Sequence, residues 1–170
     1  LFPSMTGRPE PAGWWPELVR PGGVLDPERW ALLTPALPGG VAFPHPGSEP
    51  GFTVRDMAFL AALLVRSLGV RGVHLVAGGS VGGMVALEWA ASNPLPTRTV
   101  VSFAAPATRT AHALGVNRVQ RRAPALGGPR RGLALAREMA MLTYRTPAGL
   151  EARFADRKEP DGSWSVASWL

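Results

Sequence analysis

The most constraining feature of this sequence is a glycine-rich turn between a strand-like run and a helix-like run. Residues Val73–Ala77 are mostly apolar and include two valines, as in a buried strand. They are followed by Gly78-Gly79-Ser80-Val81-Gly82-Gly83, and then by apolar residues at helical spacing through Trp89 and Ala91. A strand, a tight turn and a helix in this order predict an α/β fold.

The turn contains the pattern Gly-x-Ser-x-Gly, which is typical of a nucleophile elbow. In such an elbow the serine backbone is strained, and the residues two positions before and after it pack so closely that they must lack side chains. Gly78, Gly82 and Gly83 meet that demand, so Ser80 is the candidate nucleophile. A chance match in a chain with 20 glycines is one alternative. A phosphate-binding turn is another, although the sequence has neither Gly-x-Gly-x-x-Gly nor a Walker lysine.

The remaining sequence alternates regular elements with loops rich in proline and glycine. Residues 1–24 are predicted to form a loop that Trp14 and Trp15 anchor. Thr53 and Asp56 mark the start of a helix that continues to Gly69. Further strands are predicted over Trp30–Thr34 and Thr99–Phe103, and a further helix over Gly132–Thr143. Strands that alternate with helices favour a parallel sheet.

Composition and charge exclude several classes of protein. The chain of 170 residues has no cysteine, which excludes disulfides, thiolate metal sites and cysteine nucleophiles, and we expect no metal site. No apolar run approaches the roughly 18 residues of a membrane span, and no secretory signal is visible, so we expect a cytoplasmic protein without membrane contact. The net charge of +6 includes an arginine-rich stretch over Arg118–Arg131 without interleaved aromatic residues. This favours a solvated face, or contact with a small anion, over nucleic-acid binding.

A nucleophilic serine needs a histidine base that a carboxylate orients. In an elbow of this kind the carboxylate and then the histidine follow the serine along the chain. Downstream of Ser80 the only histidine is His112, and the only carboxylate between them is Glu88, on the helix of the elbow itself. His74 is interpreted as a packed strand residue, and His45 lies in a proline-rich loop. No triad closes within this sequence.

The elbow resembles that of the homoserine O-acetyltransferase family. Residues Gly78–Ala90 read GGSVGGMVALEWA, and the family pattern is GGSMGGMQALEWA. Further segments match the family in register along the whole chain: Ser4-Met5-Thr6-Gly7, Trp14-Trp15, Thr53-Val54-Arg55-Asp56, Asn117-Arg118-Val119-Gln120-Arg121, Gly132–Arg137 and Leu142-Thr143-Tyr144. This chain has Ser4 where the family usually has Ala, Val81 where it has Met, and Arg118 where it has Glu.

The resemblance implies a partial α/β-hydrolase fold over residues 1–170. It implies a parallel sheet with flanking helices, a helical lid that begins over residues 130–170, and missing C-terminal strands. Family members are roughly twice as long as this chain, so we expect an internal fragment. The catalytic Asp and His of the family would then lie outside this chain.

The resemblance also implies an activity in methionine biosynthesis. Ser80 would take an acetyl group from acetyl-CoA and pass it to L-homoserine, with no bound cofactor and with a homodimer as the intact form. Met5 and Val81 would supply the oxyanion N–H groups, and Arg137 would bind the carboxylate of the amino acid. Two alternatives remain: a succinyl group in place of the acetyl group, and serine in place of homoserine as the acceptor. An esterase of the same fold and an inactive remnant that lacks the catalytic Asp and His are the competing hypotheses.

Overall fold

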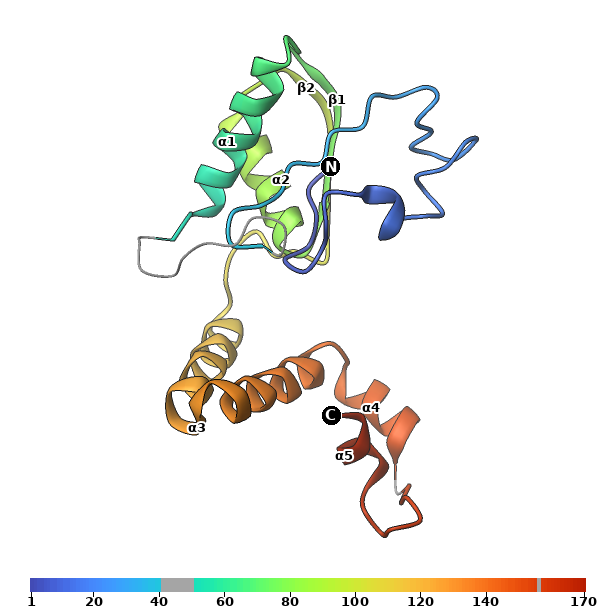
Figure 1. Cartoon of the computed structure of the whole chain (residues 1–170), viewed down its shortest axis with the longest axis vertical. Helices are drawn as coiled ribbons and strands as arrows, with labels where there is room; N and C mark the ends of the chain where they lie inside the picture. The colour runs from blue at the N-terminus through green and yellow to red at the C-terminus, as the bar shows by residue number, and fades with distance from the viewer. Residues whose placement is uncertain (41–50, 156) are drawn as a thin grey trace. The chain divides into compact units, whose positions relative to one another are not determined.

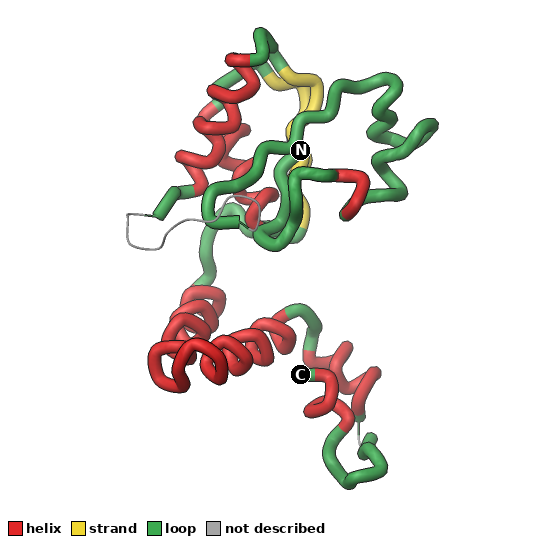
Figure 2. The backbone as a smooth tube through the Cα atoms, in the orientation of Figure 1, coloured by secondary structure: helices red, strands yellow, loops and turns green. Residues whose placement is uncertain are grey.

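The computed structural model of the protein describes residues 1–40, 51–155 and 157–170. The chain divides into two compact units, Leu1–Ala107 and Thr108–Leu170. The described strands belong to the first unit, and the second unit is built from helices and loops (Figure 2).

The first unit is built on two parallel strands, β1 (Val73–Gly79) and β2 (Thr97–Phe103). Helix α2 (Val81–Ser92) connects them and packs on both strands, and helix α1 (Val54–Ser67) packs against α2 (Figure 1). The strands run in register from the pair Val73 and Thr97 to the pair Gly79 and Phe103. This confirms the predicted parallel α/β arrangement, and it places the elbow where β1 meets α2.

The core of the first unit is centred on Trp89, which is 2% exposed. Its ring lies 5.9 Å from the ring of Phe2, and its Nε1 donates a hydrogen bond to Thr97 Oγ1 at 2.8 Å. Trp89 therefore ties α2 both to the start of β2 and to the N-terminal residues. The rest of the buried cluster is aliphatic: Leu37, Ala58, Ala61, Ala62, Val65, Val76, Val85, Ala86 and Leu95.

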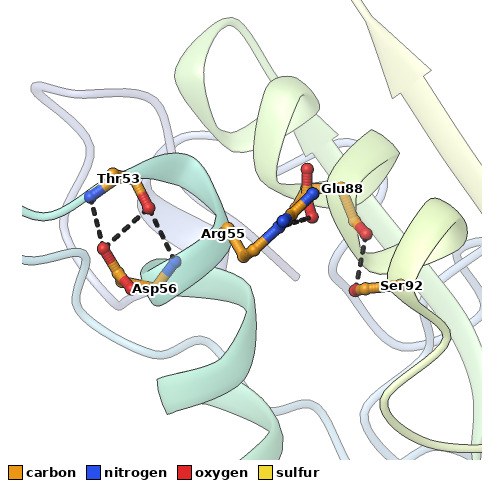
Figure 3. Close-up of polar contacts among 5 residues, drawn as sticks. All are labelled: Thr53, Arg55, Asp56, Glu88 and Ser92. Carbon is orange, nitrogen blue, oxygen red and sulfur yellow. Dashed lines mark hydrogen bonds and ion pairs between the residues drawn. The ribbon is translucent and has the colours of Figure 1, made fainter.

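Helix α1 begins at the predicted cap and is joined to α2 by an ion pair (Figure 3). Thr53 Oγ1 accepts from the Asp56 N–H, and Asp56 Oδ2 accepts from Thr53 Oγ1 and N, which lowers the pKa of Asp56. Arg55 Nε donates to Glu88 Oε1 at 2.8 Å, and this bond raises the pKa of Arg55. Ser92 Oγ donates to the backbone oxygen of Glu88. Glu88 is thus an anchor between helices rather than a partner for Ser80.

Residues 1–24 form the predicted loop, which contains one short 3-10 helix, η1 (Pro11–Gly13), and the irregular backbone continues through residue 40. The buried Asp26 carboxylate accepts the N–H groups of Glu28 and Gly22, and these bonds hold the pKa of Asp26 below its ordinary value. The ring of Trp15 lies 5.1 Å from that of Phe103 at the end of β2. This contact anchors the loop to the sheet.

The strand predicted over Trp30–Thr34 is wrong, because these residues are extended but not paired in a ladder. They lie across a cavity from β1, and the ring of Trp30 stacks on the His74 imidazole at a centroid distance of 4.6 Å. An extended segment becomes a strand only when a neighbouring backbone supplies hydrogen bonds. Within the described part of the chain, the Leu1 amino group bonds to the Leu33 carbonyl, and no ladder forms.

The second unit contains α3 (Ala111–Thr143), α4 (Pro147–Phe154) and α5 (Ser165–Trp169). The helix predicted over Gly132–Thr143 is confirmed, but it is the end of a longer helix that Thr110 caps. That helix is interrupted at Gly128, whose φ of 74° is left-handed. No described helix combines the length and hydropathy needed to cross a membrane.

Candidate active site

Ser80 occupies the turn between β1 and α2 in a strained backbone conformation. Its φ of 57° and ψ of −125° lie in a region that residues with a side chain rarely adopt. The Ser80 N–H donates to the Phe103 carbonyl at 3.1 Å, and the Met84 N–H bonds to the Ser80 carbonyl. The side chain is exposed and does not cap α2. The backbone is therefore held from both sides, and the hydroxyl is presented to solvent.

The glycines around Ser80 are required by close backbone contacts. A Cβ on Gly78 would collide with the carbonyl oxygen of Gly82, and a Cβ on Gly82 would collide with the carbonyl oxygens of Phe2 and Pro3. A Cβ on Gly83 would lie 2.6 Å from Ala105 Cβ. These contacts explain why the sequence has glycine at all three positions.

The end of β2 supports the elbow in a way that the sequence analysis missed. The Phe103 ring packs so closely on Gly79 that a Cβ there would lie 2.5 Å from Phe103 Cε2. Ser102 Oγ donates to the Gly83 carbonyl at 3.0 Å. No sequence pattern marked these contacts, because they depend on the parallel register, which places Ser102 and Phe103 opposite Gly78 and Gly79.

The structure places both predicted oxyanion donors at or near the elbow. Val81 is the first residue of α2, where backbone N–H groups have no intrahelical acceptor and the helix dipole favours negative charge. Met5 lies in the exposed turn from Ser4 to Gly7, in which the Gly7 N–H donates to the Ser4 carbonyl. The backbone just before this turn packs on Gly82. The residues directly before the Met5 turn are therefore in contact with the elbow.

Within the first unit, the other described candidate residues are not brought to Ser80. His74 faces Trp30, and Glu88 pairs with Arg55. His45 lies outside the described residues. Arg137 belongs to α3 in the second unit, where it is exposed and its Nη1 bonds to the Tyr144 hydroxyl at 3.3 Å. His112 also belongs to α3.

Substituting Ser80 with glycine is expected to stabilise the protein. Glycine adopts a positive φ without steric cost, so the free energy of unfolding should rise by about 1 kcal/mol. Denaturant unfolding measures the change. Ser92→Gly is the matched control: at the end of α2 it should lower stability by about 0.5 kcal/mol. A loss of stability in both variants would contradict strain at Ser80.

Curated relatives of this chain are homoserine O-acetyltransferases. The enzyme of Clavibacter michiganensis is 37% identical over an alignment of 202 residues. The alignment covers 99% of this chain and 52% of the relative. An enzyme of Thermus thermophilus is 38% identical over 167 residues, which cover 86% of this chain and 44% of the relative. The chain thus spans about half the length of the curated relatives it matches. No family model matches it.

Solved structures agree in fold. The crystal structure of homoserine O-acetyltransferase from Staphylococcus aureus matches 99% of this chain and 52% of its own, with a TM-score of 0.75 and 26% identity. The crystal structure of an esterase mutant matches with a TM-score of 0.74 at 19% identity, which shows the fold alone. The chain is therefore a homologue of the homoserine O-acetyltransferases with part of an α/β-hydrolase fold.

Proposed function

We propose that the intact protein transfers an acetyl group from acetyl-CoA to the hydroxyl of L-homoserine, with Ser80 as the nucleophile. The observation that carries this proposal is the elbow: an exposed serine in a strained turn, held at the N-terminus of α2 by contacts that admit only glycine. The acetyltransferase relatives match this chain along nearly all of its length, which supports the choice of donor and acceptor.

The proposed reaction has two steps, and each step is the transfer of an acyl group. Ser80 Oγ attacks the thioester carbonyl, a C–O bond forms, the C–S bond breaks, and the serine proton leaves with the CoA thiol. The homoserine hydroxyl then attacks the serine ester, its proton returns to Ser80, and O-acetylhomoserine departs. A general base must carry the proton in each step. We assign that base to the part of the intact protein outside this chain.

Residues of this chain would stabilise charge in both steps. The Val81 N–H at the start of α2 and the Met5 N–H in the adjoining turn would donate to each tetrahedral oxyanion. Arg137 would bind the carboxylate of the acceptor, because a guanidinium can pair with a carboxylate through two hydrogen bonds. Its exposed position and weak bond to Tyr144 leave its other nitrogens available for such contact.

Trapping the acyl-enzyme tests the proposal. The protein from the complete reading frame is mixed with acetyl-CoA alone, and the peptide that contains Ser80 is expected to gain one acetyl group by mass spectrometry. Adding L-homoserine should discharge it as O-acetylhomoserine much faster than water does. Discharge at the same rate without an acceptor would indicate an esterase. An unmodified Ser80 peptide would contradict the proposal, and succinyl-CoA and L-serine in the same assay decide between the alternative substrates.

A further inference from the structure

The glycine at position 79 shows that the Phe103 ring is built into the elbow. The pattern Gly-x-Ser-x-Gly leaves the residue before the serine unspecified, yet this chain has glycine there. A Cβ on Gly79 would lie 2.5 Å from Phe103 Cε2 and 3.1 Å from Phe103 Cζ. The space that a side chain at position 79 would need is therefore occupied by the Phe103 ring.

The Phe103 ring contacts the turn on the face of the sheet that points away from α2. Parallel pairing places Ser102 opposite Gly78 and Phe103 opposite Gly79. Ser102 Oγ bonds to the Gly83 carbonyl in α2, so the Ser102 side chain faces this helix. Side chains alternate between the two faces along a strand, so the Phe103 side chain faces the opposite way. The end of β2 thus contacts the turn from both faces.

Trp15 of the N-terminal loop supports the Phe103 ring. The two ring centroids lie 5.1 Å apart, and the ring planes are inclined by 42°. Phe103 is 42% exposed, so the core does not enclose its ring. The backbone of Trp15 is itself fixed, because its N–H donates to the Pro11 carbonyl at 2.8 Å and its carbonyl accepts from the N–H of the buried Val19 at 2.9 Å. A fixed indole ring therefore contacts a phenyl ring that has few other restraints.

The backbone of Ser80 depends on such contacts because its conformation is strained. Its φ of 57° is costly for a residue with a side chain, and a strained conformation persists only where its surroundings determine it. The Ser80 N–H donates to the carbonyl of Phe103, the same residue whose ring packs on Gly79. A shift of Phe103 would therefore change two restraints on Ser80 together.

We infer that Trp15 is a positioning residue for Ser80: it holds Phe103 against Gly79, and through this contact it fixes the place of the serine hydroxyl. The inference rests on the proposed function, in which Ser80 is the nucleophile. A misplacement of a reacting group by about 1 Å lowers the rate of a reaction by up to about 100-fold. Because Trp15 acts through the backbone of the turn, it affects kcat rather than the KM of either substrate.

Substitution of Trp15 in the protein from the complete reading frame tests the inference. Trp15→Ala is expected to lower kcat about tenfold, with little change in the KM for acetyl-CoA or L-homoserine. Trp15→Phe keeps an aromatic ring and should retain most of kcat. If Trp15→Ala does not fold, Trp15→Leu, which keeps an apolar side chain, is measured in its place.

Trp30→Ala is the matched control. Trp30 also belongs to the irregular N-terminal segment and also stacks on a ring of a strand, that of His74. His74 lies near the start of β1, whereas Gly79 ends this strand. Trp30→Ala therefore removes a comparable aromatic contact far from the elbow along β1, and it should leave kcat unchanged.

Hydrogen exchange gives a second readout that does not depend on acetyl transfer. The Ser80 amide, which bonds to the Phe103 carbonyl, should exchange about tenfold faster in Trp15→Ala than in the unsubstituted protein, and at an unchanged rate in Trp30→Ala. NMR measures both rates. An unsubstituted protein that transfers no acetyl group would contradict the proposed function, whereas the exchange of the Ser80 amide would still test the role of Trp15.

Three outcomes would overturn the inference. Trp15→Ala could leave both kcat and the exchange of the Ser80 amide unchanged, or Trp30→Ala could lower kcat by as much as Trp15→Ala does. The third outcome is read in the double variant Trp15→Ala/Phe103→Leu. If Trp15 acts through Phe103, the double variant should be little slower than the slower single variant. A loss equal to the product of the two single losses would show that Trp15 does not act through Phe103.

Discussion

Ser80→Ala in the protein from the complete reading frame is expected to lower the rate of acetyl transfer by about 10⁴-fold or more. Removing the nucleophile of a catalytic triad has effects of this size, and the remaining rate comes from binding and oxyanion contacts. The acetylated peptide should disappear together with the activity. Steady-state assays with acetyl-CoA and L-homoserine measure the change.

The matched control separates lost chemistry from lost structure. Alanine at position 80 must adopt the same positive φ as serine, so the free energy of unfolding is expected to change little. Ser92→Ala removes a hydroxyl from α2 that bonds only to the Glu88 carbonyl, and it should leave the transfer rate unchanged. A Ser80→Ala protein that folds normally and retains most of its activity would rule out Ser80 as the nucleophile.

The glycine-rich turn could be predicted from the sequence because its pattern is local: Ser80 lies between Gly78 and Gly82, and a Cβ on Gly78 would collide with the Gly82 carbonyl oxygen. The contacts that require glycine at 82 and 83 come from distant residues and were not visible in the same way. The cap at Thr53 was equally visible, since all three of its hydrogen bonds join residues that are three positions apart. Features of this kind depend on spacing along the chain, which a sequence shows directly.

Features that depend on distant partners could not be predicted in the same way. Trp30–Thr34 has the composition of a strand, yet whether it becomes one depends on a neighbouring backbone, and composition contains no information about that neighbour. The support of Ser80 by Phe103 spans more than 20 residues along the chain and became visible only with the strand register. The base for Ser80 is a similar case, because no histidine described in the first unit contacts it.

Gly82→Ala is expected to lower the free energy of unfolding by about 3 kcal/mol. The added methyl group would collide with the carbonyl oxygens of Phe2 and Pro3, which are backbone atoms that cannot rotate away. Helix propensity alone predicts the opposite sign, because alanine is favoured over glycine in a helix by about 1 kcal/mol. The sign of the change in the free energy of unfolding, measured by denaturant unfolding, therefore distinguishes a steric effect from a propensity effect.

Gly13→Ala is the matched control for this substitution in the same unit. Gly13 ends η1, is exposed, and a Cβ there would have no neighbour within 4 Å, so its stability change should be small. Because the Phe2–Pro3 backbone leads into the turn that carries Met5, Gly82→Ala should also slow acetyl transfer in the intact protein under conditions where it is still folded. If Gly82→Ala were as stable as Gly13→Ala, the elbow and the N-terminal segment would not be in the close contact that the oxyanion assignment of Met5 needs.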